Sequence, residues 1–218
     1  MMLWSAGPPA PNPRRVTIFA AEKGIALPTT DLAIFKREHK APEFVAKNPR
    51  GQVPALELDD GTVIAESISI CRYLDALHPD LPLFGAKGEQ GALDRALVDV
   101  ALRRVETVLG TPLSLAWVYD HPYTAAVFGS EHKAFGASNR PRVVDALAWF
   151  DGHIGAFVAG EAFTIADIAL WCAIDFGHFA GLVDLTPHHR LTEWFTRVSA
   201  RPSVIATGGA VASPAAAA

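Results

Sequence analysis

The sequence predicts a chain in two parts, an α/β sandwich followed by an all-helical domain. In residues 1–79, short apolar runs alternate with helical patterns in the order β-α-β-α-β-β-α. Residues 80–88 are rich in proline and glycine and carry no helical pattern, so they predict a linker. From residue 89 to residue 205 apolar residues recur only at helical spacing. We expect residues 206–218 to form a frayed tail.

The elements of the first part follow from local patterns. The patterns predict strands over residues 2–5 and 32–34, a helix over residues 14–23 that ends at Gly24, and a short helix that begins near Pro42. The dipeptide Asp60-Gly61 lies between two apolar runs and predicts the turn of a β-hairpin. Ser67 stands where the N-cap of the next helix is expected.

The second part predicts four longer helices. Apolar periodicity indicates helices over residues 93–108, 140–157, 165–179 and 191–198. The third of these is apolar almost all round, which is typical of a helix buried on every side. Thr164 and Asp167 are spaced as a capping box at its start, and losing such a box costs about 1 kcal/mol or more.

Composition excludes several classes of function. Half of the 218 residues are hydrophobic, 19% are charged and the net charge is −4, which suits a large core and argues against nucleic-acid binding. No apolar run approaches the roughly 20 residues of a membrane helix, and no secretory signal is recognisable, so a cytoplasmic protein is expected.

Cys71 and Cys172 lie in apolar helical patterns and are interpreted as small buried residues. The histidines lack metal-ligand spacing, so we predict no metal.

Four local motifs carry a resemblance to a known family. They are Val53-Pro54 before the hairpin, Glu66-Ser67 at the next helix, the stretch "NPRGQVP" and the stretch "FTIADIAL". In this order and spacing the chain resembles the cytosolic glutathione transferases, of a bacterial nu-like or theta/beta-like type. The resemblance covers nearly the whole chain. It implies a thioredoxin-like N-terminal domain, an all-α C-terminal domain, glutathione as co-substrate, a role in detoxification and a homodimer in which the small domain packs on the partner's helices.

The resemblance implies that Val53-Pro54 holds the cysteinyl part of glutathione. A cis bond before Pro54 would leave the N–H and C=O of Val53 free of the sheet, to pair with an extended peptide. The alternative is an ordinary loop proline before a strand.

The two ends of glutathione have their own candidates. Ser67, at a helix start, would bind the γ-glutamyl carboxylate, and Glu66 would bind its ammonium group. The alternative is a simple N-cap with an acid in the first turn. His39, Lys40 and Gln52 would hold the glycyl carboxylate by charge-assisted bonds, although His39 and Lys40 also suit a solvated loop.

The residue that would contact the thiol departs from the family pattern. The thiolate is the reactive species, so a transferase needs a hydrogen-bond donor at the sulfur. The family places Tyr, Ser or Cys just after the first strand, but counting back from Gly24 puts Ala6, Ala10 and Asn12 at these positions. Asn12 is therefore the leading candidate and Ser5 the second. Alternatively, Asn12 only turns the chain and caps the first helix.

The electrophile is expected to bind between the two parts, because ligand sites favour domain interfaces. Arg104, Trp117 and Tyr119 could border that cleft, although an aromatic stripe on a helix more often belongs to the core. The favoured function is thiolate attack on a small hydrophobic electrophile. Two alternatives are glutathione-dependent reduction of peroxides or disulfides on the same scaffold, and a non-catalytic glutathione-binding or regulatory protein.

Overall fold

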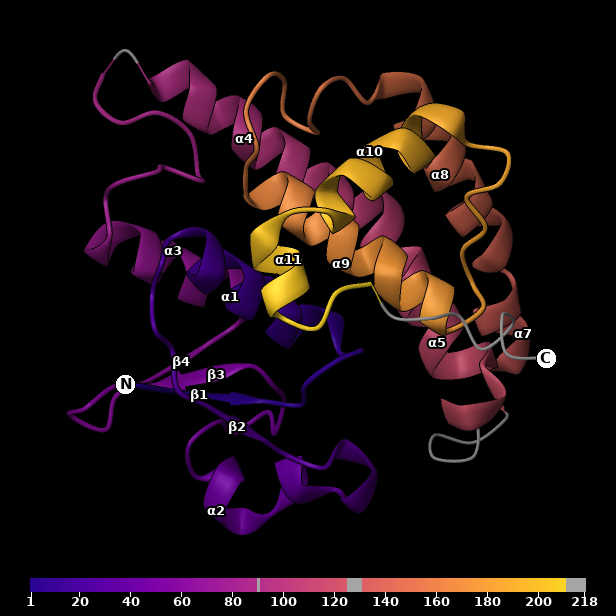
Figure 1. Ribbon diagram of the computed structural model, residues 1–218. Coiled ribbons are helices and arrows are strands. Elements are labelled where there is room, and N and C mark those ends of the chain that lie inside the picture. The colour runs from indigo at the N-terminus through magenta and orange to yellow at the C-terminus, as the bar shows by residue number, and fades with distance from the viewer. Residues whose placement is uncertain (90, 125–130, 211–218) are drawn as a thin grey trace.

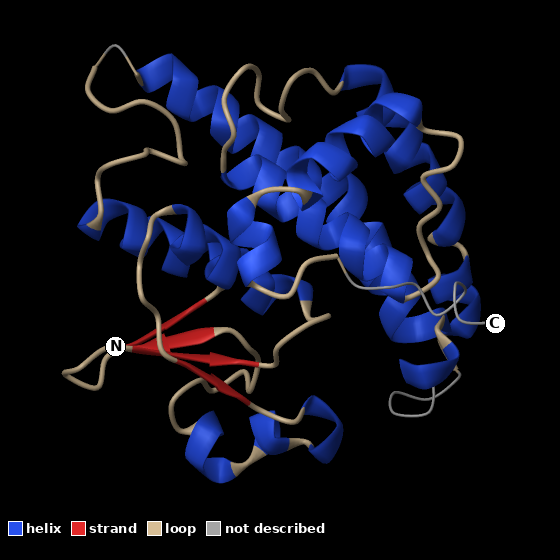
Figure 2. Cartoon of the chain, in the orientation of Figure 1, coloured by secondary structure: helices blue, strands red, loops and turns tan. Residues whose placement is uncertain are grey.

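The computed structural model describes residues 1–89, 91–124 and 131–210. A four-stranded sheet lies at one side of the molecule and a bundle of helices at the other (Figures 1 and 2). The strands are β1 (Met2–Ser5), β2 (Thr29–Asp31), β3 (Ala55–Glu57) and β4 (Val63–Ala65). Helices α1 (Pro11–Glu22) and α3 (Ser67–Leu77) cover the face toward the bundle, and α2 (Pro42–Val45) covers the other face (Figure 1).

The sheet register brings distant parts of the chain together at one end of the strands. The strand order is β2-β1-β3-β4, with β1 parallel to β2 and β3 antiparallel to both β1 and β4. Ala55 pairs with Trp4 on one side and with Ala65 on the other. Continuing this register places Pro54 between Ser5 and Glu66. The loop after β1, the start of β3 and the start of α3 therefore meet at the same end of the strands.

The predicted hairpin is confirmed, and the starts of the two helices that flank the sheet are corrected. The hairpin turns at Asp60-Gly61, where Asp60 accepts a 2.8 Å bond from the Thr62 N–H. Helix α1 begins three residues earlier than predicted, because proline in a first turn loses no needed hydrogen bond. Ser67 is the first residue of α3 and Glu66 is its N-cap, so the N-cap prediction for Ser67 is wrong by one residue.

The second strand is also displaced from its predicted place. The pattern indicated residues 32–34, but β2 covers Thr29–Asp31, and a 3₁₀ turn at Ile34–Lys36 follows. β2 is an exposed edge strand, so it needs no apolar run. Its β-branched threonines pair with β1, and this pairing rather than hydrophobicity defines the strand.

The second part is all-helical, as predicted. Its segments are α4 (Ala92–Arg104), a π-helical segment (Val105–Gly110), α5 (Thr111–Asp120), α7 (Lys133–Ala137), α8 (Arg140–His153), α9 (Ile165–Phe179), α10 (His189–Ser199) and α11 (Pro202–Ala206). The helix predicted to end at residue 108 continues through the π-helical segment into α5, and α8 ends four residues early. Of the predicted tail, residues 206–210 are described, and residues 211–218 lie outside the described residues.

Helix α9 is the centre of the core, and its predicted capping box is present. Thr164 Oγ1 accepts a 3.3 Å bond from the Ala166 N–H, and Asp167 Oδ2 accepts a 2.9 Å bond from the Thr164 N–H. Asp167 also accepts 2.9 Å bonds from the Val158 N–H and from Trp194 Nε1. Burial raises the pKa of Asp167, and these bonds oppose that rise. The capping box thus ties the start of α9 to the rest of the helical domain.

Helix α1 joins the two parts of the molecule. It packs against α3 on one side and against α9 and α11 on the other (Figure 1). Cys71 of α3 and Cys172 of α9 are both buried free thiols, as predicted. Burial raises the pKa of both, that of Cys172 to about 12. Among the described helices, none is long and apolar enough to cross a membrane.

Candidate functional site

The peptide segment before β3 leaves main-chain groups unused. The Val53-Pro54 bond is cis, as the resemblance implied. Within the described ranges, neither the N–H nor the C=O of Val53 has a hydrogen-bond partner in the protein. The preceding residue is fixed, because the buried Asn48 donates a 2.7 Å bond from Nδ2 to the Gln52 carbonyl. A short extended main-chain edge is therefore held open toward solvent.

The start of α3 lies beside this edge. Glu66 has φ 66°, a left-handed conformation that is uncommon for a residue with a side chain. Its carboxylate is exposed, and the nearest cation is Arg50, whose Nη1 lies 3.4 Å away. Ser67 is buried as the first helical residue, and α3 has no side-chain cap, so the simple N-cap interpretation is wrong. The first N–H groups of α3 remain available to an anion.

His39 and Lys40 lie against Gly51, and Gln52 follows it in the chain. A Cβ at Gly51 would lie 2.7 Å from the His39 carbonyl oxygen and 3.0 Å from Lys40 Cδ, and its φ of 54° also favours glycine. Lys40 Nζ donates a 2.9 Å bond to the Arg50 carbonyl. Buried His39 Nδ1 has no partner among the described residues. Burial, followed by the charges of Lys40 and Arg37, lowers the pKa of His39.

The two thiol candidates lie in different surroundings. Asn12 is exposed in the first turn of α1, and the described residues offer its side chain no hydrogen bond. The N-cap of α1 is Ala10, so the interpretation of Asn12 as a helix cap is wrong. Ser5 is buried, and its Oγ accepts a 3.2 Å bond from the Gly7 N–H. Asn12 therefore has a free amide, while Ser5 is engaged inside the protein.

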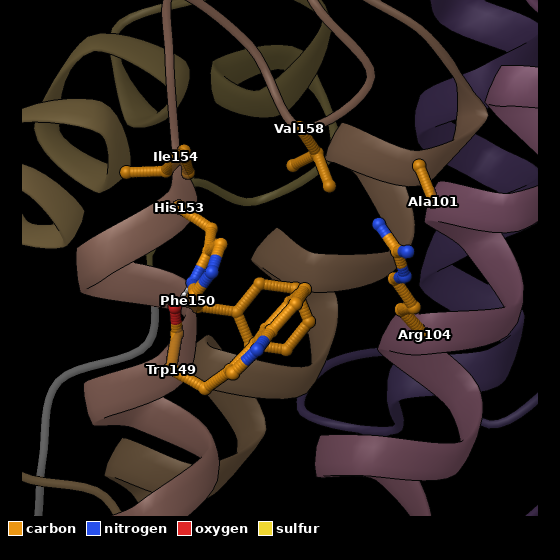
Figure 3. Close-up of a pocket in the computed structure, with 7 residues that line it drawn as sticks. All are labelled: Ala101, Arg104, Trp149, Phe150, His153, Ile154 and Val158. Atoms are coloured by element: carbon orange, nitrogen blue, oxygen red, sulfur yellow. Dashed lines mark hydrogen bonds between the residues drawn. The ribbon is translucent and has the colours of Figure 1, made fainter.

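The three predicted pocket residues are not brought together. Trp117 packs edge-on against Phe176, with ring centroids 5.0 Å apart. Tyr119 packs instead against Phe135 at 5.9 Å. Arg104 lies at 5.5 Å from the Trp149 ring and faces a cavity of about 50 Å³ between α4 and α8 (Figure 3). The prediction of one cleft bordered by all three is wrong, because residues 104, 117 and 119 face different neighbours on consecutive helical segments.

Sequence reasoning missed an aromatic contact between the two parts. Phe35, in the turn after β2, is 76% exposed and meets Tyr123 edge-on at 5.0 Å between centroids. Tyr123 in turn stacks on Trp117 at 6.2 Å. Phe35, Tyr123 and Trp117 thus form an aromatic row across the domain boundary. The only signal was the aromatic content of "AIFK" and "DHPY", which does not reveal that the segments meet.

His121 adds a titratable group to this row. Its ring centroid lies 4.3 Å from that of Trp117. Burial and then the charge of Arg140 lower the pKa of His121, against an opposing effect of Asp120. The imidazole is therefore neutral over a wider pH range than an exposed histidine. No group of three or more potential metal ligands occurs among the described residues.

Comparison with known proteins places this geometry in a family. Family models described as the glutathione S-transferase N-terminal and C-terminal domains match residues 10–77 and 121–202. Glutathione S-transferase 2 of Saccharomyces cerevisiae is 35% identical over 206 residues, which cover 90% of this chain and 85% of the relative. The chain belongs to the glutathione S-transferase family.

Solved structures support the same assignment. The crystal structure of Gtt2 from Saccharomyces cerevisiae superposes with a TM-score of 0.86 at 32% identity, covering 95% of this chain and 100% of that chain. A class Gtt2 glutathione S-transferase of Vibrio parahaemolyticus has a TM-score of 0.80 at 30% identity, covering 95% and 97%. The thioredoxin-like domain followed by an all-α domain is thus the glutathione transferase fold. One of these relatives is Gtt2 itself and the other is described as class Gtt2, a type that the sequence motifs did not indicate.

Proposed function

We propose that this glutathione S-transferase homologue activates the thiol of glutathione for attack on a small hydrophobic electrophile. The observation that carries the proposal is the unpaired main chain of Val53 beside the start of α3. An extended peptide can pair with such an edge as an added strand, while a helix start binds its terminal carboxylate. Glutathione has both features, since its cysteinyl residue is flanked by a γ-glutamyl end and a glycyl end.

Each part of glutathione has proposed contacts in this arrangement. The Val53 main chain pairs with the cysteinyl backbone beside Pro54. Ser67 and the first N–H groups of α3 bind the γ-glutamyl carboxylate, and exposed Glu66 binds its ammonium group. At the other end, the glycyl carboxylate accepts bonds from His39 and Lys40, which lie against Gly51, and from Gln52, the next residue in the chain.

Asn12 is the proposed sulfur contact. Its amide can donate an N–H to the thiolate and so lower the thiol pKa, although it cannot accept the thiol proton as a base at neutral pH. The electrophile is proposed to lie against the aromatic row of Phe35, Tyr123 and Trp117. This row is placed at the domain boundary, and its flat apolar faces suit an apolar reactant.

The absorbance of the glutathione thiolate in the ultraviolet tests this proposal. Titrating the full chain with glutathione should show thiolate formation at a pH where free glutathione is mostly a thiol. Asn12→Ala should reduce the thiolate fraction while leaving the affinity for glutathione nearly unchanged. Bound glutathione with an unshifted thiol would refute transferase activity. If Asn12→Ala has no effect and Ser5→Ala abolishes turnover, the sulfur contact is assigned to the wrong residue.

A second candidate function is glutathione-dependent reduction of a peroxide or a disulfide. The exposed amide of Asn12, in place of a hydroxyl or thiol, favours it, because glutathione itself then supplies the reducing electrons. Comparing turnover of a chlorinated aromatic with that of a hydroperoxide and of a glutathionyl disulfide separates the two reactions. Binding without turnover of any of these would indicate the non-catalytic alternative.

Three further properties belong to this proposal. They are a homodimer, a cytoplasmic location and a role in detoxification. Exposed apolar residues of α4, Leu93, Leu97 and Val100, support a partner on this helix. Sedimentation of the full chain tests the dimer.

A further inference from the structure

A cavity lies on the opposite side of α1 from the proposed sulfur contact. It has a volume of about 190 Å³ and is lined by Ser5, Arg14, Thr17, Thr29, Asp31 and Thr207, with Gly7-Pro8 at its rim. We name it the β2-side cavity. Arg14 and Thr17 share one face of α1, while Asn12 is displaced by about 200° around the helix from Arg14. With sulfur bound at Asn12, as proposed above, this cavity lies across α1 from the reacting atom, so we assign it a ligand other than the electrophile.

Three hydroxyl groups of the cavity can only accept a hydrogen bond from a ligand. Thr17 Oγ1 donates its single hydrogen to the Arg14 carbonyl at 3.1 Å, and Thr29 Oγ1 donates to the Leu27 carbonyl at 3.1 Å. Thr207 Oγ1 donates to the Ser203 carbonyl at 2.9 Å. What these side chains still offer is oxygen lone pairs. The lining is therefore rich in acceptors.

Asp31 adds a negative charge to this lining. Its carboxylate has neither an ion pair nor a hydrogen bond within residues 1–89, 91–124 and 131–210. Asp31 pairs with Ser5 across the sheet, and a Cβ at Gly7 would lie 3.0 Å from Asp31 Oδ2. Glycine at position 7 thus lets the loop after β1 approach the carboxylate closely.

Arg14 supplies a buried donor on the other side of the cavity. Its side chain is 2% exposed, its Nη1 pairs with Asp175, and its Nη2 donates a 2.5 Å bond to the Gly209 carbonyl. Asp175 compensates the guanidinium charge. The Nε–H is buried and has no acceptor among the described residues. Buried donors are nearly always satisfied, so this one indicates a missing acceptor.

We propose that the β2-side cavity binds a small primary ammonium that also carries an acceptor oxygen, as in an amino alcohol. The ammonium group donates to Asp31 and the threonine oxygens, and the oxygen accepts from Arg14 Nε or the Ser5 hydroxyl. The cavity volume is about 190 Å³. A protein cavity of about 150 Å³ holds benzene, so the ligand has roughly five to seven non-hydrogen atoms.

Isothermal titration of the full chain with 3-amino-1-propanol tests this site. Binding is expected in the millimolar range, because so small a ligand makes few contacts. 1,3-Propanediol lacks the charge and propionate reverses it, so each should bind at least about tenfold more weakly. Saturating glutathione should leave the affinity for 3-amino-1-propanol within about twofold, because the site is separate. Equal binding of all three compounds, or of none, would overturn the proposal.

Substitutions in the β2-side cavity test whether 3-amino-1-propanol binds there. Asp31→Asn should weaken binding of 3-amino-1-propanol at least about tenfold, since the amide oxygen can still accept a hydrogen bond but the negative charge opposite the ammonium is lost. Asp145→Asn, which changes an exposed carboxylate on α8, is the matched control and should have no effect. Thr207→Val lies on a different segment and should weaken binding about threefold or more, which keeps the test valid if Asp31→Asn folds poorly. Undiminished binding by either of the two cavity variants, once folded, would contradict the assignment.

Discussion

Arg14 of α1 and Asp175 of α9 form an ion pair in which each side chain is only 2% exposed. The Arg14 guanidinium also lies 4.7 Å from the centre of the Trp171 ring. This contact joins the thioredoxin-like domain to the helical domain. Because Asn12 is two residues away, the ion pair also sets where the proposed sulfur contact lies relative to the helical domain.

Breaking this ion pair should destabilise the fold strongly. Asp175→Asn leaves a buried guanidinium uncompensated, and we expect a loss of about 3–5 kcal/mol in the free energy of unfolding, measured with urea. Asp99→Asn disrupts the exposed pair with Arg72 and should cost less than about 1 kcal/mol. The double variant Arg14→Met/Asp175→Leu should recover much of the loss. Equal costs for the Asp175 and Asp99 variants would show that burial does not govern this ion pair.

Glu22 should make stability depend on pH. Burial alone would raise its pKa, but hydrogen bonds from Arg201 and Ser203, with the charge of Arg201, lower it below 4.5. The ionised carboxylate therefore stabilises the folded state above about pH 4.5, and this contribution is lost as the pH falls through the lowered value. Unfolding of Glu22→Gln should be easier than that of the wild type at pH 7, and the difference should shrink by pH 3. A difference that does not change with pH would contradict the lowered pKa.

Gly136 permits the close packing of α7 on α5. A Cβ there would lie 2.6 Å from the Asp120 nitrogen and 2.7 Å from the Tyr119 carbonyl carbon. Gly136→Ala should therefore lower the thermal midpoint, with a cost of about 1–3 kcal/mol. Gly152→Ala is the control, because no atom lies within 4 Å of its Cβ position, and alanine is the better helix former. A control that loses as much stability as Gly136→Ala would rule out crowding as the cause.

Glutathione binding should depend on the charge of Glu66. Glu66→Gln removes the proposed partner of the ligand ammonium, and we expect at least about tenfold weaker binding by titration calorimetry. Arg50→Gln, at the neighbouring cation, should leave affinity unchanged or slightly higher, because Arg50 competes only weakly at 3.4 Å. A loss caused by Arg50→Gln and not by Glu66→Gln would reverse the proposed orientation of glutathione.

The sequence predicts elements defined by local patterns. Helix α9 begins and ends at the predicted residues, because its capping box and continuous apolar composition are both local. The cis bond at Val53-Pro54 is likewise confirmed from a motif. Strand β2 was misplaced because it is defined by pairing with β1 across more than 20 residues, and its threonines carry no periodic apolar signal.

Contacts between distant segments could not be predicted from the sequence. Phe35 and Tyr123 lie in the two different domains, far apart in the sequence, and only the docking of the domains brings them together. Trp117 and Tyr119 are two residues apart on α5 and so face different neighbours. Aromatic composition identifies such residues as candidates, but their grouping depends on tertiary packing.

The burial of Cys71 and Cys172 has a chemical consequence for a protein that handles activated sulfur. Both side chains remain protonated at physiological pH and lie out of contact with solvent, since the pKa of Cys172 is about 12 and that of Cys71 is also raised. Neither cysteine thiol is therefore accessible to alkylating agents or mixed-disulfide partners in the folded state.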